Sequence, residues 1–143
     1  MLTRVMVVYE AAPGATLTLP LFAARVAAGF PSPADNHMEG KLDLNEHLVR
    51  HPAATFFVRA AGDSMTGAGI HSGDLLVVDR AVEPADGHVV IAVVDGDLTV
   101  KRIRKANGKV FLAPDNPNYP PLRVGDETQV EVWGVVTNVI HPV

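Results

Sequence analysis

Apolar and β-branched residues are concentrated in short runs from residue 55 onward, and the runs are too short and too rich in valine for long helices. This pattern predicts a mainly β body. We expect strands over 55–60, 75–79, 88–94, 98–104, 109–113 and 130–140.

Two dipeptides mark turns between these runs. Asp95-Gly96 and Asn107-Gly108 are sequences that tolerate the positive φ angles of two-residue hairpin turns. The runs 89–94, 98–104 and 109–113 are therefore predicted to be consecutive antiparallel strands.

One short helix is predicted over 41–51. Leu42, Leu44 and Leu48 are spaced close to the helical repeat, and Pro52 follows as a stop signal.

Residues 1–40 have a different composition and are predicted to form an arm. They are rich in alanine and proline, and Pro31 and Pro33 favour an extended backbone before them. We accordingly divide the chain into an N-terminal arm, 1–40, and one compact domain, 41–143.

Composition narrows the functional classes. The 143 residues are 48% hydrophobic and 20% charged, with a net charge of −4, as in an ordinary globular protein. A chain that binds duplex DNA directly usually has a basic face, so any contact with DNA is expected to be indirect.

The absence of cysteine agrees with a reducing compartment. Glu10, Pro13, Pro20 and Arg25 interrupt any export signal, and we expect no membrane segment.

Ser64 is the candidate nucleophile. It lies in Ala61-Gly62-Asp63-Ser64-Met65, directly after a predicted strand, where a glycine turn can present a hydroxyl beside backbone N–H groups. The alternative is that Asp63 or Ser64 caps a short helix or turn. The α/β-hydrolase motif is absent, because Thr66 stands where that motif has its second glycine.

Lys101 is the candidate base. The six histidines are scattered and offer no favoured partner for a serine, whereas a lysine can accept a proton if burial keeps its amine neutral. Lys101 lies within an apolar strand, on the face shared with Thr99 and Ile103. An ordinary solvated strand lysine is the alternative, and periodicity does not decide between the two. His47 and His51 lack the glutamate of the zinc-protease motif, so a surface or capping role is expected for them.

Several motifs, in the right order, resemble the LexA/UmuD family of self-cleaving serine-lysine peptidases. The body of the family is matched by Gly62-Asp63-Ser64-Met65, by 73–79 (GDLLVVD) and by 97–102 (DLTVKR). The UmuD branch is matched by 28–34 (AGFPSPA), 42–45 (LDLN), 51–58 (HPAATFFV) and 132–136 (VWGVV).

The resemblance implies a fold, a site and partners. The fold would be mainly β, with compact, highly curved antiparallel sheets, a flexible N-terminal arm and one short helix. Ser64 would be the nucleophile and Lys101 the general base, cutting between Ala28 and Gly29, with backbone N–H groups of Asp63 and Ser64 as the oxyanion site. It further implies a cytoplasmic homodimer without cofactor or metal, which joins a UmuC-type polymerase subunit in error-prone synthesis past DNA lesions during the SOS response. A RecA nucleoprotein filament would promote the cut.

Two other functions remain open at this point. A damage-regulated repressor of LexA type would need a DNA-binding domain, for which the 28 residues before the predicted cut, with Pro13 and Pro20 among them, are too short. An accessory subunit that no longer cleaves itself would keep the same motifs.

Overall fold

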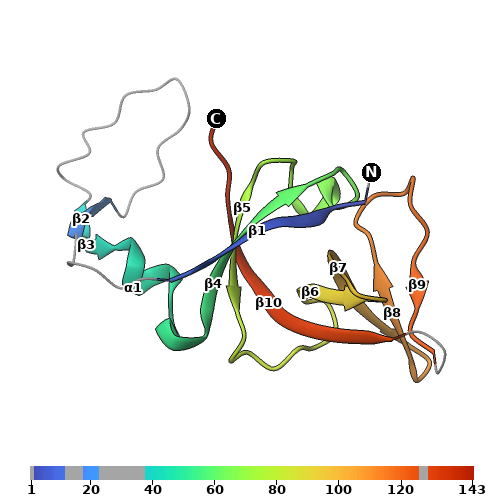
Figure 1. The fold of residues 1–143 in the computed structure, drawn as a ribbon. Coiled ribbons are helices and arrows are strands. Elements are labelled where there is room, and N and C mark those ends of the chain that lie inside the picture. Colours follow the sequence, from blue (N-terminus) through green and yellow to red (C-terminus); the bar gives the residue numbers. More distant parts are fainter. Residues whose placement is uncertain (1, 12–17, 23–37, 126–128) are drawn as a thin grey trace.

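The computed structural model describes residues 2–11, 18–22, 38–125 and 129–143. Strands dominate the described part, as predicted (Figure 1). The strands are β1 (Arg4–Glu10), β2 (Thr18–Phe22), β3 (Met38–Asp43), β4 (Thr55–Ala61), β5 (Leu75–Asp79), β6 (Val89–Val94), β7 (Asp97–Ala106), β8 (Lys109–Ala113), β9 (Leu122–Arg123) and β10 (Val130–Ile140). The helical elements are α1 (Leu44–Leu48) and the 3-10 turns η2 (Pro52–Ala54) and η3 (Thr66–Ala68).

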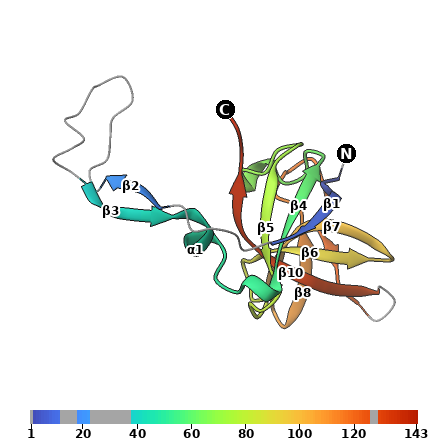
Figure 2. The same cartoon turned by 60° about the vertical axis from the view of Figure 1, so that its left-hand side comes forward.

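Six of the strands close into an antiparallel barrel. Their order is β1-β4-β5-β10-β6-β7, and the pairing of Arg4 in β1 with Thr99 in β7 joins the two ends. β8 and β9 extend the sheet beyond β7. Figure 2 shows the barrel at one end of the molecule and the β2–β3 ribbon projecting away from it.

Both predicted hairpin turns are confirmed. Asp95 and Gly96 have φ angles of 48° and 88°, and Asn107 and Gly108 have φ angles of 52° and 73°. Two consecutive positive φ angles give a turn whose twist matches the strands on either side. β6, β7 and β8 therefore follow one another as an antiparallel meander.

The helix is shorter than the predicted 41–51. Lys41 and Leu42 pair with β2 as part of β3, and α1 begins only after Asp43. Asp43 is the N-cap in an extended conformation, and its carboxylate accepts a hydrogen bond from the Asn45 N–H at 3.0 Å. The leucine spacing thus fits a strand followed by one helical turn as well as it fits a longer helix.

β1 was not foreseen by the prediction of an arm over residues 1–40. It pairs with β4 along its whole length and is part of the barrel wall. The domain boundary at residue 40 stays a prediction.

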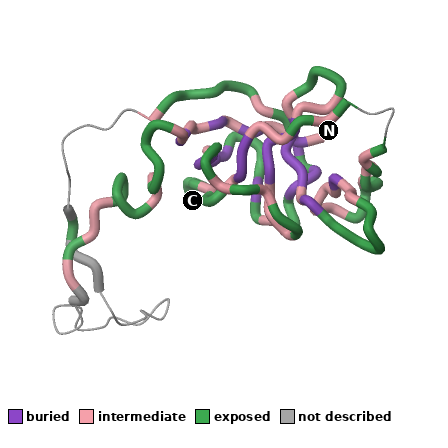
Figure 3. The backbone as a smooth tube through the Cα atoms, turned by 90° about the horizontal axis from the view of Figure 1, so that it is seen from below, coloured by how far each residue is buried: buried purple, intermediate pink, exposed green. Residues whose placement is uncertain are grey.

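Two groups of buried side chains fill the body. One is built around β4, β5 and the Ser64 loop, and the other lies between β6, β7, β8 and β10. Figure 3 shows the buried segments gathered within the barrel, with exposed segments around it. Among the described residues, no helix is long and apolar enough to cross a membrane.

Candidate active site

Ser64 lies in the loop that leaves β4. The chain turns at Gly62, whose φ of 107° favours glycine, and Met65 then enters the core with no exposed surface. Ser64 is itself fully buried. The loop is therefore anchored on both sides of the serine, and its hydroxyl has a fixed environment.

A second loop, residues 115–119, holds the Ser64 loop in place. The Asn116 side-chain amide donates to the Asp63 carbonyl at 2.9 Å, and the Tyr119 hydroxyl donates to Asp63 Oδ1 at 2.5 Å. The bond from Tyr119 lowers the pKa of the Asp63 carboxyl and raises the pKa of the Tyr119 phenol. The Asp115 N–H points at Met65 Sδ, 3.3 Å away.

Gly67 allows the two loops to approach closely. Its N–H donates to the Asp115 carbonyl at 2.7 Å, and a Cβ at this position would lie only 2.5 Å from the same oxygen. Arg102, the neighbour of Lys101, binds the Asp115 carboxylate through Nε at 2.9 Å and through a terminal nitrogen at 2.7 Å. The strand that carries the candidate base thus also fixes the loop that supports the candidate nucleophile.

The ion pair between Arg102 and Asp115 is half-buried, whereas Arg104, Lys105 and Lys109, which follow along the same hairpin, are exposed.

Lys101 is buried in β7, with 5% of its surface exposed, and the alternative of a solvated strand lysine is wrong. Burial lowers the pKa of its ammonium group below the ordinary value of 10.5, because the charged form loses hydration. No carboxylate among the described residues forms an ion pair with it, so nothing there offsets this loss. Such a lysine gives up its proton more readily than a surface lysine.

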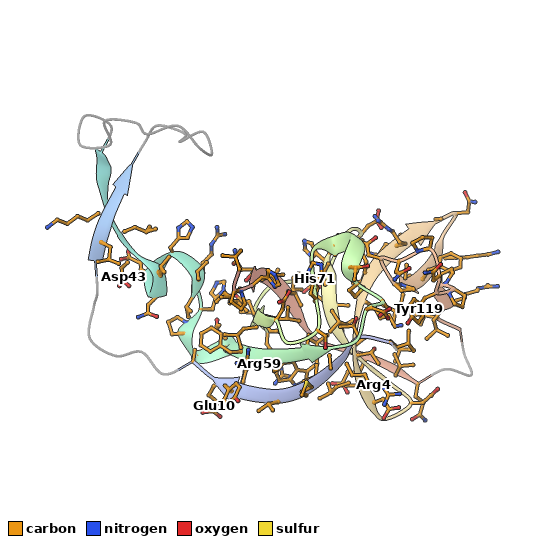
Figure 4. The ribbon with its side chains drawn as sticks, turned by 90° about the horizontal axis from the view of Figure 1, so that it is seen from above. Arg4, Glu10, Asp43, Arg59, His71 and Tyr119 are labelled. Atoms are coloured by element: carbon orange, nitrogen blue, oxygen red, sulfur yellow. The ribbon has the colours of Figure 1, made fainter. Side chains whose placement is uncertain are left out.

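Thr3 lies between the Ser64 loop and β7. Its N–H donates to Ser64 Oγ at 2.7 Å, and its carbonyl accepts from the N–H of Val100 at 3.1 Å. The serine hydroxyl and the strand of Lys101 are therefore bridged by the backbone of one residue. Figure 4 shows β1 running from Arg4 to Glu10 along β4, away from this point.

The predicted cut between Ala28 and Gly29 lies outside the described residues. It belongs to the connection between β2 and β3, which pair from Thr18–Asp43 at one end to Phe22–Met38 at the other.

Sequence reasoning did not find Thr3, Asp115, Asn116 or Tyr119. Thr3 acts through its backbone, which carries no signal of residue type. The stretch Asp115-Asn116-Pro117-Asn118-Tyr119-Pro120 has the composition of a loop, but nothing in it indicates its partner.

Comparisons with known proteins decide the family. The model of the family described as Peptidase S24-like matches residues 20–137. The chain belongs to this family. Protein SamA of Salmonella typhimurium is 52% identical over 124 residues, which is 87% of this chain and 86% of that protein. Protein MucA of Escherichia coli is 42% identical over 129 residues, 88% of each chain. The LexA repressor of Bordetella parapertussis is 36% identical over 145 residues, 96% of this chain and 67% of the repressor.

Membership of the S24-like family confirms the resemblance drawn from the separated motifs, and the predicted mainly β fold is confirmed with it. The family is one of self-cleaving serine peptidases.

Proposed function

We propose that this chain is a self-cleaving peptidase of the UmuD type, in which Ser64 cuts the bond between Ala28 and Gly29 with Lys101 as general base. The burial of Lys101, without a carboxylate partner in the described structure, carries this proposal. Burial of a lysine without an ion-pair partner destabilises the folded protein. A role as general base would explain why a lysine occupies this buried position.

The reaction follows from these groups. The neutral amine of Lys101 takes the proton of the Ser64 hydroxyl while Oγ attacks the carbonyl carbon of Ala28. The C–N bond to Gly29 then breaks, the proton passes to the leaving amine of Gly29, and an ester joins Ala28 to Ser64. Water hydrolyses this ester and restores the serine. Backbone N–H groups at Asp63 and Ser64 would hold the negative oxygen of each tetrahedral intermediate.

The position of Thr3 adds a condition to this mechanism. Its N–H is bonded to the Ser64 oxygen that must attack, and its backbone lies on the route between the serine and β7. The peptide that carries Ala28 can approach Ser64 only after residues near Thr3 withdraw. The described arrangement is thus a resting form, in which Thr3, directly before β1, protects the hydroxyl.

Cleavage would also separate β1 and β2 covalently from the other strands. β1 and β2 precede the cut, while β3 and all later strands follow it. The cut therefore leaves β1 held to β4, and β2 held to β3, by non-covalent contacts alone. Loss of the N-terminal fragment would free an edge of β4, and an unpaired edge can accept a strand of another molecule.

The resemblance supplies the biological setting of the proposal. The shortened form, Gly29 to Val143, would act as a homodimer with a UmuC-type polymerase subunit in SOS mutagenesis, and a RecA nucleoprotein filament would promote the cut. The net charge of −4 fits contact with DNA through these partners.

The test is a time course of the purified chain from pH 7 to pH 10.5, followed by gel electrophoresis. The cleavage rate should rise with pH and level off below 10.5, where the buried lysine is already neutral. Ser64→Ala and Lys101→Ala should remain uncut while keeping the circular dichroism of the wild type. A folded chain that stays intact at every pH would instead be a non-cleaving accessory subunit, and the proposal would be wrong.

A further inference from the structure

Three side chains that can bind a metal meet on the barrel surface, apart from the residues assigned to cleavage. His71 lies in the loop between η3 and β5, Asp74 directly precedes β5, and His141 directly follows β10. Ile140 pairs with Leu75, so the end of β10 and the start of β5 are neighbours. His71 is labelled in Figure 4, on the loop that carries it.

The three side chains converge on one carboxylate. His141 Nδ1 is 2.5 Å from Asp74 Oδ1, and His71 Nδ1 is 3.8 Å from Asp74 Oδ2. One donor atom from each residue lies within 4.8 Å of the other two. The imidazole rings are 5.2 Å apart between centroids and are inclined to each other by 41°.

The carboxylate is fixed, whereas the two imidazoles can adjust. Asp74 is buried, and its Oδ2 accepts a hydrogen bond from the backbone N–H of His71 at 2.8 Å. The side chains of His71 and His141 are 53% and 49% exposed, so small rotations are open to both. A tetrahedral ion with bonds of about 2.0 to 2.1 Å needs its ligand atoms about 3.3 Å apart, which small rotations would reach.

Hydrogen bonding accounts for only part of this arrangement. His141 is at hydrogen-bond distance from Asp74, but His71 Nδ1 at 3.8 Å is too far, although it faces the same carboxylate. A cation between the three groups would use all three donors.

We propose that His71, Asp74 and His141 form a site for one divalent transition-metal ion, with zinc as its occupant. Two imidazole nitrogens and one carboxylate oxygen are a donor set that zinc prefers, while magnesium and calcium prefer oxygen ligands alone. Three protein ligands leave one position for water. The bound ion would fasten the C-terminal end of β10 to the loop before β5.

This inference does not depend on the proposed cleavage, and its test can be separated from it. Zn²⁺ is titrated into the full-length Ser64→Ala chain by isothermal calorimetry, and Co²⁺ serves as an optical probe of coordination geometry. We expect one saturable site per chain, reversed by EDTA, with a four-coordinate Co²⁺ spectrum and a higher midpoint of thermal unfolding when zinc is bound.

Exposed histidines provide both the variants and the control. His71→Ala and His141→Ala should each weaken zinc binding at least about tenfold and abolish the Co²⁺ spectrum, with the fold checked by circular dichroism. His47→Ala removes an exposed histidine of α1 outside the cluster and should bind zinc as the parent does. Binding that is absent from the parent, or equal in all three variants, would mean that the cluster is only a hydrogen-bonded ion pair and would overturn the proposal.

Discussion

The burial of Lys101 has a thermodynamic consequence that can be measured without cleavage. Because its folded pKa lies below 10.5, the unfolded chain binds more protons than the folded chain between these two pKa values. The stability of the protein therefore rises with pH across this window, and the full penalty of the buried charge is present below it. Each pKa unit of lowering corresponds to about 1.4 kcal/mol.

Lys101→Met should raise the free energy of unfolding at pH 7, because it fills the same space without a charge. The gain should shrink as the pH rises toward 10.5, because the folded wild-type lysine loses its proton in this range and the penalty of a buried charge disappears. Urea unfolding of both chains in the Ser64→Ala background, at pH 7 and pH 10, measures this. A methionine variant that is less stable at both pH values would argue against a desolvated lysine.

A substitution at Thr3 can remove the hydrogen bond to Ser64 Oγ without changing Ser64 itself. Thr3→Pro removes the N–H that binds Ser64 Oγ, and we expect cleavage to accelerate several-fold. Thr3→Val is the control, since it keeps this N–H and removes a buried hydroxyl that has no hydrogen-bond partner among the described residues. It should raise the free energy of unfolding by about 1 kcal/mol and leave the rate unchanged. Equal rates of cleavage in the two variants, measured by gel, would contradict a protective role for Thr3.

Gly67 tests the support of the Ser64 loop. In Gly67→Ala the new methyl group meets the Asp115 carbonyl, so the loop must shift; we expect slower cleavage and a loss of about 1 to 3 kcal/mol in stability. Gly125→Ala is the matched control, because a Cβ there meets nothing within 4 Å. If both variants cleave and unfold like the wild type, the contact between the two loops does not position Ser64.

At the scale of single residues, the sequence was sufficient to identify those whose role depends on the chemistry of the side chain. Ser64 and Lys101 could be selected because a hydroxyl and an amine in those motifs suggest a reaction. The burial of Lys101 could not be predicted from the sequence, since it depends on which strands cover that face of β7. Thr3 acts through its backbone and Gly67 through the absence of a side chain, and neither role has a signature in one sequence.

Among the elements, β1 differs from the other barrel strands in how it is held. Most of its side chains are exposed, among them Met6 at 60% and Tyr9 at 47%, whereas four of the five residues of β5 are buried. Backbone hydrogen bonds to β4 therefore hold β1, with little help from packing. Elements with few buried contacts open at lower free energy than the core.

Hydrogen exchange should detect this difference. In the intact Ser64→Ala chain, amides of Arg4–Glu10 should exchange faster than those of Leu75–Asp79. In a chain that begins at Gly29, β4 should lose protection while β6 keeps it, because β4 alone of the two pairs with β1. Exchange of β1 as slow as that of β5 would mean that the strand does not open before global unfolding.

Three strands, 75–79, 109–113 and 130–140, were predicted with the observed limits. Runs of valine and other apolar residues are local signals, so they could be recognised in the sequence without knowledge of the strand partners. β1 was missed because its partners, β4 and β7, lie about 50 and 95 residues later, and pairing over such distances has no local signal. The helix was overestimated because a strand and one helical turn share its leucine spacing.

At the scale of the whole molecule, the barrel and the family agree with the proposal that the chain cleaves itself. Residues 20–137 match the family model, and the N-terminal β1 closes the barrel that carries both candidate catalytic residues. Self-cleavage would thus remove part of the wall around its own active site. The reaction would then be a single event for each molecule, and it would alter the surface open to partners.

Mass spectrometry of the purified chain after incubation at alkaline pH tests this account most directly. We predict two products, residues 1–28 ending in Ala28 and residues 29–143 beginning with Gly29, and neither of them from Ser64→Ala under the same conditions. Gly29→Lys should also stay intact, because bulk beside the reacting carbonyl hinders its approach to Ser64. An uncut wild-type chain, or the same two products from Ser64→Ala, would contradict the account.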